Sequence, residues 1–248
     1  MTSTNLEQFK HRAARQIERA KQHRSHILLY SEDSYPTNLW ASNNPVPVLY
    51  VRGDLEMLRN RKAVACVGSR NIRDEYVERQ REFATFASKT GFVVVSGFAL
   101  GADSVAHRAA RDSGGSTVCV MPCGLDRPFP PENKGLWAEF NTYQGATLLS
   151  EFPFGTAAAT LTLRKRNKTI VGLALGALVA QSSTKGGAMN AFRFAIEQRK
   201  PIATFSPNGT EDTGGNQMIV ENSGTEFPVD QPSEQAWTAW LRTLSSSI

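Results

Sequence analysis

The chain has 248 residues, 40% of them apolar and 21% charged, which is the composition of an ordinary soluble globular protein. Its 28 Lys and Arg against 23 Asp and Glu give a net charge of +5, which favours an anionic partner. The longest apolar run, residues 170–180, is too short to cross a bilayer, and the first residues lack a signal-peptide core, so we expect a cytoplasmic protein without membrane contact.

The N-terminal part, residues 1–55, is expected to be a helix followed by an extended lead-in. Over residues 1–30 the apolar residues Leu6, Phe9 and Ile17 recur at helical spacing, with basic residues on the other faces. We interpret this as a docking helix with a solvated face, and phosphate contact is the alternative. Prolines interrupt residues 34–53, which favours a segment packed on the main sheet over a central strand.

From residue 61 onward, strand-like and helix-like stretches alternate. The expected strands are Ala63–Val67, Phe92–Val95, Ser116–Met121, Ala146–Leu149, Ala177–Gln181 and Pro201–Phe205. The expected helices are Asp74–Lys89, Ala102–Asp112, Glu132–Tyr143, Asn167–Leu175 and Ala188–Arg199, with Asp74 as an N-cap and Gly91 and Gly114 as stops. This alternation predicts an α/β fold over residues 56–230, with a mostly parallel sheet and helices on both faces.

The C-terminal part is expected to be a loop-rich return followed by an amphipathic segment at 231–248. Trp237 and Trp240 share a stripe with two leucines, which indicates packing, with nucleobase stacking as the alternative. The three cysteines, Cys66, Cys119 and Cys123, lie in or just after strand-like runs and lack a zinc-ligand pattern. We interpret them as buried, reduced thiols.

Small residues follow five of the expected strands. The loops are Gly68-Ser69-Arg70, Ser96 to Gly101, Pro122 to Gly124, Ser150-Glu151 and Ser182 to Gly187. Such residues let backbone N–H groups approach an anion closely, and the carboxyl ends of parallel strands share one edge. Neither the G-x-G-x-x-G pattern nor the P-loop pattern is present. We predict a phosphate-holding crevice whose candidates from these loops are Gly68, Ser69, Arg70, Gly97, Gly101, Lys185, Gly186 and Gly187.

A run of cations precedes the expected helix at Asn167. Arg164, Lys165, Arg166 and Lys168 would there oppose the helix dipole, so a polyanion is the natural compensating partner. This predicts phosphate contact by Arg164, Arg166, Asn167 and Lys168.

The sequence offers no assembled catalytic or metal-binding group, so we expect no catalytic residue, metal or cofactor. His107 is interpreted as a helix-packing residue and Asp103 as a first-turn dipole partner. Glu151, at a strand end, can organise the crevice by pairing with an arginine.

An ordered series of short motifs carries a family resemblance. The motifs are Tyr35-Pro36, Leu49-Tyr50-x-x-Gly53, Val67-Gly-Ser-Arg70, Val95-Ser-Gly-x-Ala-x-Gly-x-Asp103, Ala106-His107, Gly124-Leu-Asp126, Pro130, Ser150-Glu151, Arg166-Asn167, Lys185-x-Gly187 and Gly215 to Ile219. The series resembles the DprA/Smf DNA-processing family, over residues 30–228. The resemblance implies an extended Rossmann-like three-layer core, binding of single-stranded DNA, a homodimer, and loading of a RecA-type recombinase during natural transformation. Carried over by position, the DNA pocket would comprise Gly68, Ser69, Arg70, Arg166, Lys168, Lys185 and Gly187.

The chain departs from the family pattern at three motif positions. Lys168 replaces the second arginine of an Arg-Asn-Arg run, Gly186 replaces a serine, and Phe129 replaces a tyrosine. A lysine keeps the charge and loses the bidentate geometry of arginine. We expect no counterpart of the family's winged-helix extension after the core, which leaves a mobile-element or defence role open.

Two other functions remain as alternatives. The first is a Rossmann-like sensor of a small nucleotide signal, in which the same loops hold one nucleotide. The second is a phosphoribohydrolase similar to lysine-decarboxylase-like enzymes. The Pro-Gly-Gly-x-Gly-Thr-x-x-Glu run of those enzymes has no matching glutamate after Thr184.

Overall fold

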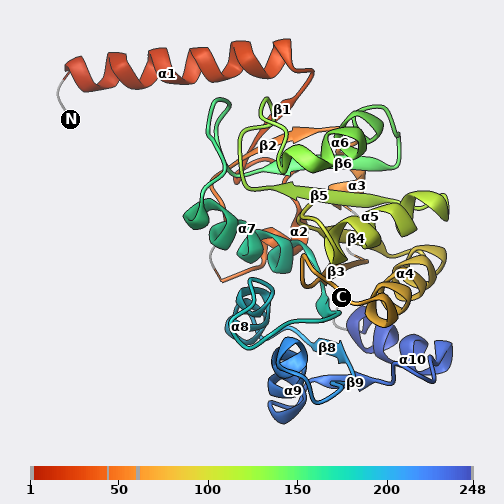
Figure 1. The fold of residues 1–248 in the computed structure, drawn as a ribbon. Coiled ribbons are helices and arrows are strands. Elements are labelled where there is room, and N and C mark those ends of the chain that lie inside the picture. Colours follow the sequence, from red (N-terminus) through yellow and green to blue (C-terminus); the bar gives the residue numbers. More distant parts are fainter. Residues whose placement is uncertain (1–2, 44, 60–61, 247–248) are drawn as a thin grey trace.

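Figure 1 shows the computed structural model, which describes residues 3–43, 45–59 and 62–246 and contains one nine-stranded sheet. The strands are β1 His26–Leu29, β2 Val48–Arg52, β3 Ala63–Val67, β4 Val93–Ser96, β5 Thr117–Met121, β6 Ala146–Ser150, β7 Gly176–Val179, β8 Ile202–Phe205 and β9 Thr225–Phe227. Their order across the sheet is β1-β2-β6-β5-β4-β3-β7-β8-β9. Only β1 and β2 pair antiparallel to their neighbours, so the predicted α/β fold with a mostly parallel sheet is confirmed.

The strand order changes direction in the middle of the sheet. From β3 the chain adds β4, β5 and β6 on one side, and then returns to add β7, β8 and β9 on the other. The connections leaving β3 and β7 therefore diverge to opposite sides. In open parallel sheets, ligands bind in the crevice outside the carboxyl ends of strands at such a switch point.

Helices cover both faces of the sheet (Figure 1). They are α1 Ser3–Gln22, α2 Thr37–Trp40, α3 Glu56–Arg59, α4 Asp74–Lys89, α5 Ala102–Asp112, α6 Lys134–Phe140, α7 Thr160–Leu173, α8 Met189–Glu197, α9 Gly214–Glu221 and α10 Glu234–Ser245, with short 3-10 helices at Pro131–Asn133 and Glu211–Thr213. The bounds of α4 and α5 agree with the prediction. Gly91 and Gly114 adopt left-handed φ angles of +86° and +73° directly after the C-caps, as glycine at a helix stop does. Asp74 is the first helical residue, and the N-cap is Arg73.

Three groups of buried apolar side chains form the core. On one face, Tyr76 and Phe83 of α4 pack with Trp237 and Trp240 of α10, so the packing interpretation of the tryptophans is confirmed. On the other face, α2, α7 and α8 pack on the sheet through residues such as Leu39, Ile170 and Phe192. A third group joins β5 and β6 to α6 through Phe98, Trp137 and Phe140.

The N-terminal prediction is wrong in two respects. The first helix ends at Gln22, and residues 26–29 form strand β1. Strand β2 lies between β1 and β6, which makes it an internal strand and not merely a lead-in. The prolines permit this because they precede the strand: the carbonyl oxygen of Pro47 still accepts a hydrogen bond from Tyr30 N at 3.0 Å.

Several other boundaries differ from the predicted ones. Helix α7 begins at Thr160, seven residues before the expected Asn167, because the Ala159 N–H donates to Thr162 Oγ1 at 2.9 Å and caps the helix there. Strand β7 ends at Val179 and not at Gln181. The expected helix at 132–143 is a 3-10 turn followed by the shorter α6. The loop-rich return contains both α9 and β9.

The three cysteines are free and buried, as expected from their strand-like surroundings. Burial raises the pKa of the Cys66 and Cys119 thiols, and raises the pKa of Cys123 to about 12. Within the described residues, no helix combines the length and apolar character needed to span a bilayer.

Candidate nucleic-acid interface

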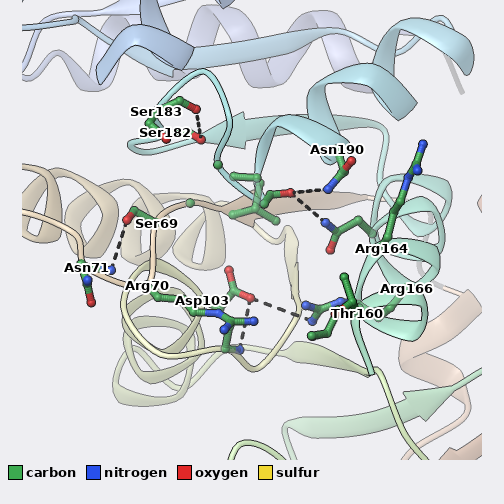
Figure 2. Close-up of a pocket in the computed structure, with 18 of the residues that line it drawn as sticks. Ser69, Arg70, Asn71, Asp103, Thr160, Arg164, Arg166, Ser182, Ser183 and Asn190 are labelled. Carbon is green, nitrogen blue, oxygen red and sulfur yellow. Dashed lines mark hydrogen bonds and ion pairs between the residues drawn. The ribbon is translucent and has the colours of Figure 1, made fainter. Parts of the chain in front are cut away.

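A cavity of about 730 Å³ opens where β3 and β7 end (Figure 2). The β3–α4 loop bounds it on one side, α7 on another, and the β7–α8 loop on a third. The lining residues are Val67, Gly68, Ser69, Arg70, Asn71, Ala99, Asp103, Thr160, Leu163, Arg164, Arg166, Asn167, Ser182, Ser183, Gly186, Gly187, Ala188, Asn190 and Asp212. The cavity therefore occupies the switch point of the sheet.

The cavity brings together eight of the twelve predicted site residues. These are Gly68, Ser69, Arg70, Arg164, Arg166, Asn167, Gly186 and Gly187. The other four, Gly97, Gly101, Lys168 and Lys185, do not line it. The sequence interpretation missed Asn71, Thr160, Asn190 and Asp212. Thr160 could have been predicted if the start of α7 had been placed correctly. Asp212 is distant in the sequence from the other site residues, and no sequence motif around it indicates a binding role.

Gly97 and Gly101 support the cavity from behind its lining. A side chain at Gly97 would overlap the Arg166 guanidinium. Gly101 has a left-handed φ of +70°, and a Cβ there would overlap the carbonyl oxygens of Ser69 and Arg70. Both positions require glycine because backbone and guanidinium approach too closely for any side chain.

Arg166 is buried at the base of the cavity and organises the loop after β4. Its guanidinium donates to the carbonyl oxygens of Gly97 and Val120, the latter at 3.1 Å. Asp103 lies 4.0 Å away and supplies the opposite charge. The Nε atom of Arg166 is buried without a partner within the described structure. Arg166 thus lines the cavity with part of a side chain that is otherwise bound to the protein.

The basic run lies inside α7 and not at its N-terminus, so the helix-dipole argument for a polyanion is wrong. Six residues of helix precede Arg166. The run instead places its members on different sides of α7: Arg164 and Asn167 line the cavity, while Lys168 lines a separate cleft. The charge that reaches the cavity is therefore set by helical periodicity and not by the helix end.

Asp103 is buried in the first turn of α5. Its Oδ2 accepts a hydrogen bond from the Ala99 N–H at 3.2 Å. Burial raises the pKa of this carboxyl group, and the Arg166 charge opposes that increase. Asp103 is therefore the partner of Arg166 rather than only a dipole partner of the helix.

Exposed cations surround the opening of the cavity. Figure 2 shows Arg70 and Arg164 on opposite sides of the cavity, one in the β3–α4 loop and one on α7. Lys185 is exposed in the β7–α8 loop. In the part of the chain that the structure describes, the ion pairs involve other cations, and none involves these three. Their charges are available to an external anion.

Polar contacts hold the β7–α8 loop in place. The carbonyl oxygen of Gly187 accepts hydrogen bonds from Asn167 Nδ2 and Asn190 Nδ2, both at 3.1 Å. Asn216 is buried and accepts from the Ser182 N–H at 2.8 Å. The loop is thereby connected to α7, α8 and α9, and its serines and glycines face the cavity as a preformed surface.

His107 has a packing role, as interpreted from the sequence. It lies between the rings of Phe98 and Phe140, and its Nδ1 is 2.7 Å from Thr117 Oγ1. Burial and then the Arg166 charge lower the pKa of His107 to about 3. Such an imidazole is neutral near pH 7 and does not face the cavity.

Glu151 does not pair with an arginine in the described structure, contrary to the prediction. Its Oε1 accepts a hydrogen bond from Thr169 Oγ1 at 3.2 Å on the other side of α7. Burial raises the pKa of Glu151, and that hydrogen bond and the charges of Lys165 and Lys168 oppose the increase. Across the described residues, no cluster of three His, Cys, Asp or Glu side chains is arranged to hold a metal ion.

The chain matches the family of DNA recombination-mediator protein A over residues 26–232. It is 31% identical to Protein Smf of Escherichia coli over 211 residues, covering 84% of this chain and 55% of that protein. It is 32% identical to DNA processing protein DprA of Streptococcus pneumoniae over 173 residues, covering 69% of this chain and 59% of that protein. The chain thus spans about half the length of the curated relatives it matches.

Two solved structures share the fold. DprA from Streptococcus pneumoniae superposes with a TM-score of 0.77 at 25% identity, covering 86% of this chain and 73% of that chain. DNA processing protein A from Helicobacter pylori, solved for its single-stranded DNA binding mode, gives a TM-score of 0.76 at 24% identity, covering 90% and 96%. The family match over residues 26–232 and the Rossmann-like sheet agree with the resemblance seen in the motifs. The chain belongs to the DprA/Smf family of DNA recombination mediators.

Proposed function

We propose that this chain binds single-stranded DNA in the switch-point cavity without cleaving or modifying it. The observation that carries the proposal is the pair of exposed arginines, Arg70 and Arg164, which line the cavity on opposite sides and form no ion pair with any described residue. Guanidinium groups bind phosphate oxygens through two parallel hydrogen bonds. The backbone of the glycine and serine loops between them adds further donors for a phosphate.

The carboxyl groups of the cavity support binding over catalysis. Asp103 is buried beside Arg166 and accepts the Ala99 N–H, so it is held by the protein. Asp212 pairs with Arg73 Nε at 2.5 Å and accepts from Gln181 Nε2 at 2.9 Å. General acid–base catalysis needs a group positioned to exchange a proton with a substrate. Both carboxyl groups instead have protein partners.

The family supports a role in recombination. Because the matching family consists of recombination mediators, we propose that the bound strand is protected and transferred to a RecA-type recombinase. We also propose that the chain acts as a homodimer in the cytoplasm. Light scattering of the purified chain tests the dimer, and recombinase filament formation on coated single strands tests the transfer.

Fluorescence anisotropy with a labelled oligothymidylate tests DNA binding. We expect the affinity to fall steeply with salt, because the log–log slope for single strands is about −0.7 per neutralised phosphate. Arg70→Ala and Lys185→Ala should each weaken binding several-fold and make that slope shallower by about one contact. A duplex of equal length should bind more weakly.

Lys89→Ala is the matched control for these variants. Lys89 is exposed at the end of α4, on the edge of the sheet opposite the cavity, so its removal changes the net charge equally and leaves the site intact. Equal losses for all three variants would indicate a nonspecific charge effect. Salt-insensitive binding, or none, would reject the proposal.

The cavity volume also favours a second candidate, a sensor of one nucleotide. About 730 Å³ falls in the range of small-ligand sites, which spans roughly 300–1,000 Å³. A thermal-shift titration with mononucleotides distinguishes the two, because a ligand that binds only the folded state raises Tm. Stabilisation by a mononucleotide at micromolar concentration, with no competition by DNA, would favour the sensor.

A further inference from the structure

A second cleft of about 450 Å³ lies on the other side of α7 from the switch-point cavity. Its walls are α7 itself, residues 42 and 45–47 between α2 and β2, and Phe194 of α8. Apolar side chains such as Leu39, Val46 and Leu161 line it, and Lys165 and Lys168 add positive charge. The DNA-binding role proposed above does not account for this cleft.

The periodicity of α7 divides its side chains between the two hollows. Thr160, Leu163 and Asn167 are three and four residues apart and line the switch-point cavity. Leu161, Lys165 and Lys168 have the same spacing on the adjacent face and line the second cleft. Arg164 lies between these faces and lines both. Arg164 therefore supplies a positive charge between the switch-point cavity and the second cleft, on the surface of α7.

The chemistry of the second cleft suits a nucleotide. Its apolar walls can receive the faces of a nucleobase, while the lysine ammonium groups can contact phosphate oxygens. Glu151 contributes an acceptor within the cleft and is already hydrogen-bonded to Thr169 Oγ1. Among the described residues, neither Lys165 nor Lys168 forms an ion pair within 4.0 Å, so both remain available to an external anion.

We propose that the second cleft is an additional nucleotide subsite for the same DNA strand. The strand leaves the switch-point cavity over Arg164, crosses α7, and places a base in the apolar cleft with its phosphates against Lys165 and Lys168. This inference rests on the proposed DNA-binding function. It specifies the route of the DNA strand along the protein and the basic residues that line this route. It also gives Lys168 a role that the switch-point cavity does not offer.

The length of the DNA separates the two sites experimentally. We would measure anisotropy with oligothymidylates of about 6 and about 16 nucleotides, which lie near the lower and upper ends of the site sizes of single-strand binders. The double variant Lys165→Ala/Lys168→Ala should bind the short strand like the unmodified chain and the long strand about tenfold more weakly. Arg70→Ala should weaken binding of both. The double variant Lys89→Ala/Lys134→Ala is the charge-matched control, because both lysines are exposed on helices that do not line either hollow.

The outcomes are distinct for the two proposals. If Lys165→Ala/Lys168→Ala binds both strands normally while Arg70→Ala weakens both, the second subsite is rejected and the switch-point site stands. Equal weakening of the short and long strands by the lysine variant would place these lysines in the first site and likewise reject the subsite. If the unmodified chain binds neither strand, the DNA-binding proposal fails together with this one. Thermal melting of each variant verifies that it is folded.

Discussion

The guanidinium of Arg166 lies against Gly97 and donates a hydrogen bond to the carbonyl oxygen of that glycine. The contact joins the middle of α7 to the loop that follows β4. Because Arg166 also donates to Val120 and faces Asp103, the ends of β4 and β5 and the first turn of α5 share a single buried cation. The shape of the cavity base depends on this contact.

Gly97→Ala should destabilise the fold and disturb the cavity. The new Cβ would overlap the Arg166 guanidinium, and overpacking of a buried site costs about 1–3 kcal/mol. Thermal melting should show a lower Tm, and DNA affinity should fall. Gly135→Ala is the control, since Gly135 lies in α6 with nothing within 4 Å of an added Cβ, and it should be neutral or stabilising. A Gly97→Ala protein as stable as the unmodified chain would contradict the described contact.

Arg166→Met should leave the Asp103 carboxylate buried without its charge partner. Breaking one side of a buried pair costs about 3–5 kcal/mol. The second substitution Asp103→Asn should restore part of the lost stability, because it removes the uncompensated charge. Urea unfolding of the single and double variants measures this coupling, and strictly additive losses would argue against the pair.

The same variant should change how stability depends on pH. The pKa of Asp103 is already raised by burial, so the folded state holds the proton more tightly than the unfolded state. Stability from this group is complete below the unfolded pKa and declines as pH rises towards the folded pKa. Without Arg166 the folded pKa moves higher, so the decline should extend to higher pH. Identical pH profiles for Arg166→Met and the unmodified chain would contradict this reasoning.

His107 should make the fold sensitive to acid. Its folded pKa of about 3 lies below the ordinary value of 6.5, so the unfolded state binds the proton first as pH falls. Between about pH 7 and pH 5 this linkage removes about 2 kcal/mol of unfolding free energy. His107→Leu should lose that dependence, whereas the exposed His11→Leu should keep it. Chemical denaturation at several pH values gives the comparison.

Lys200→Met should weaken the end of α7. The Lys200 ammonium donates to the carbonyl oxygens of Val171, Gly172 and Ala174 at 2.7, 2.8 and 2.6 Å. Removing the ammonium leaves the Gly172 and Ala174 oxygens without this donor, at a cost of about 1–3 kcal/mol, whereas the Val171 oxygen still accepts from the Ala174 N–H at 3.2 Å. Hydrogen exchange of the last turn of α7 should accelerate. Lys89→Met, at an exposed position, should leave exchange unchanged.

Helices with clear end signals could be predicted well from the sequence. The bounds of α4 and α5 follow from the glycines that stop them and from the regular spacing of their apolar residues. Helix α7 begins at Thr160 instead, with Ala159 as N-cap, and alanine carries no capping preference in the sequence. The Ala159 N–H donates to Thr162 Oγ1, and that hydroxyl donates back to the Ala159 carbonyl oxygen. This pair of hydrogen bonds can be recognised only in the folded structure. The misplaced start put the basic run at the wrong position in the helix.

Strand ends indicated the location of the site but not which side chains share it. Gly68, Ser69 and Arg70 follow β3 directly, so the rule for parallel sheets places them correctly. The distribution of Arg164, Asn167 and Lys168 around α7 depends on the helix start and on what packs against each face. Gly97 and Gly101 lie in a loop of small residues and were therefore predicted to contact phosphate. In the structure they allow close packing behind the residues that line the cavity. Local sequence cannot distinguish these two uses of glycine.

The buried state of all three cysteines makes the chain a convenient host for spectroscopic probes. Cys66, Cys119 and Cys123 are free but buried, and burial raises the pKa of each thiol, which slows their reaction with thiol-directed dyes. A single cysteine introduced at an exposed position of the β7–α8 loop such as Thr184 would therefore be labelled selectively, without first deleting the natural thiols. Two such labels, one beside each hollow of α7, would report strand occupancy along the protein in real time.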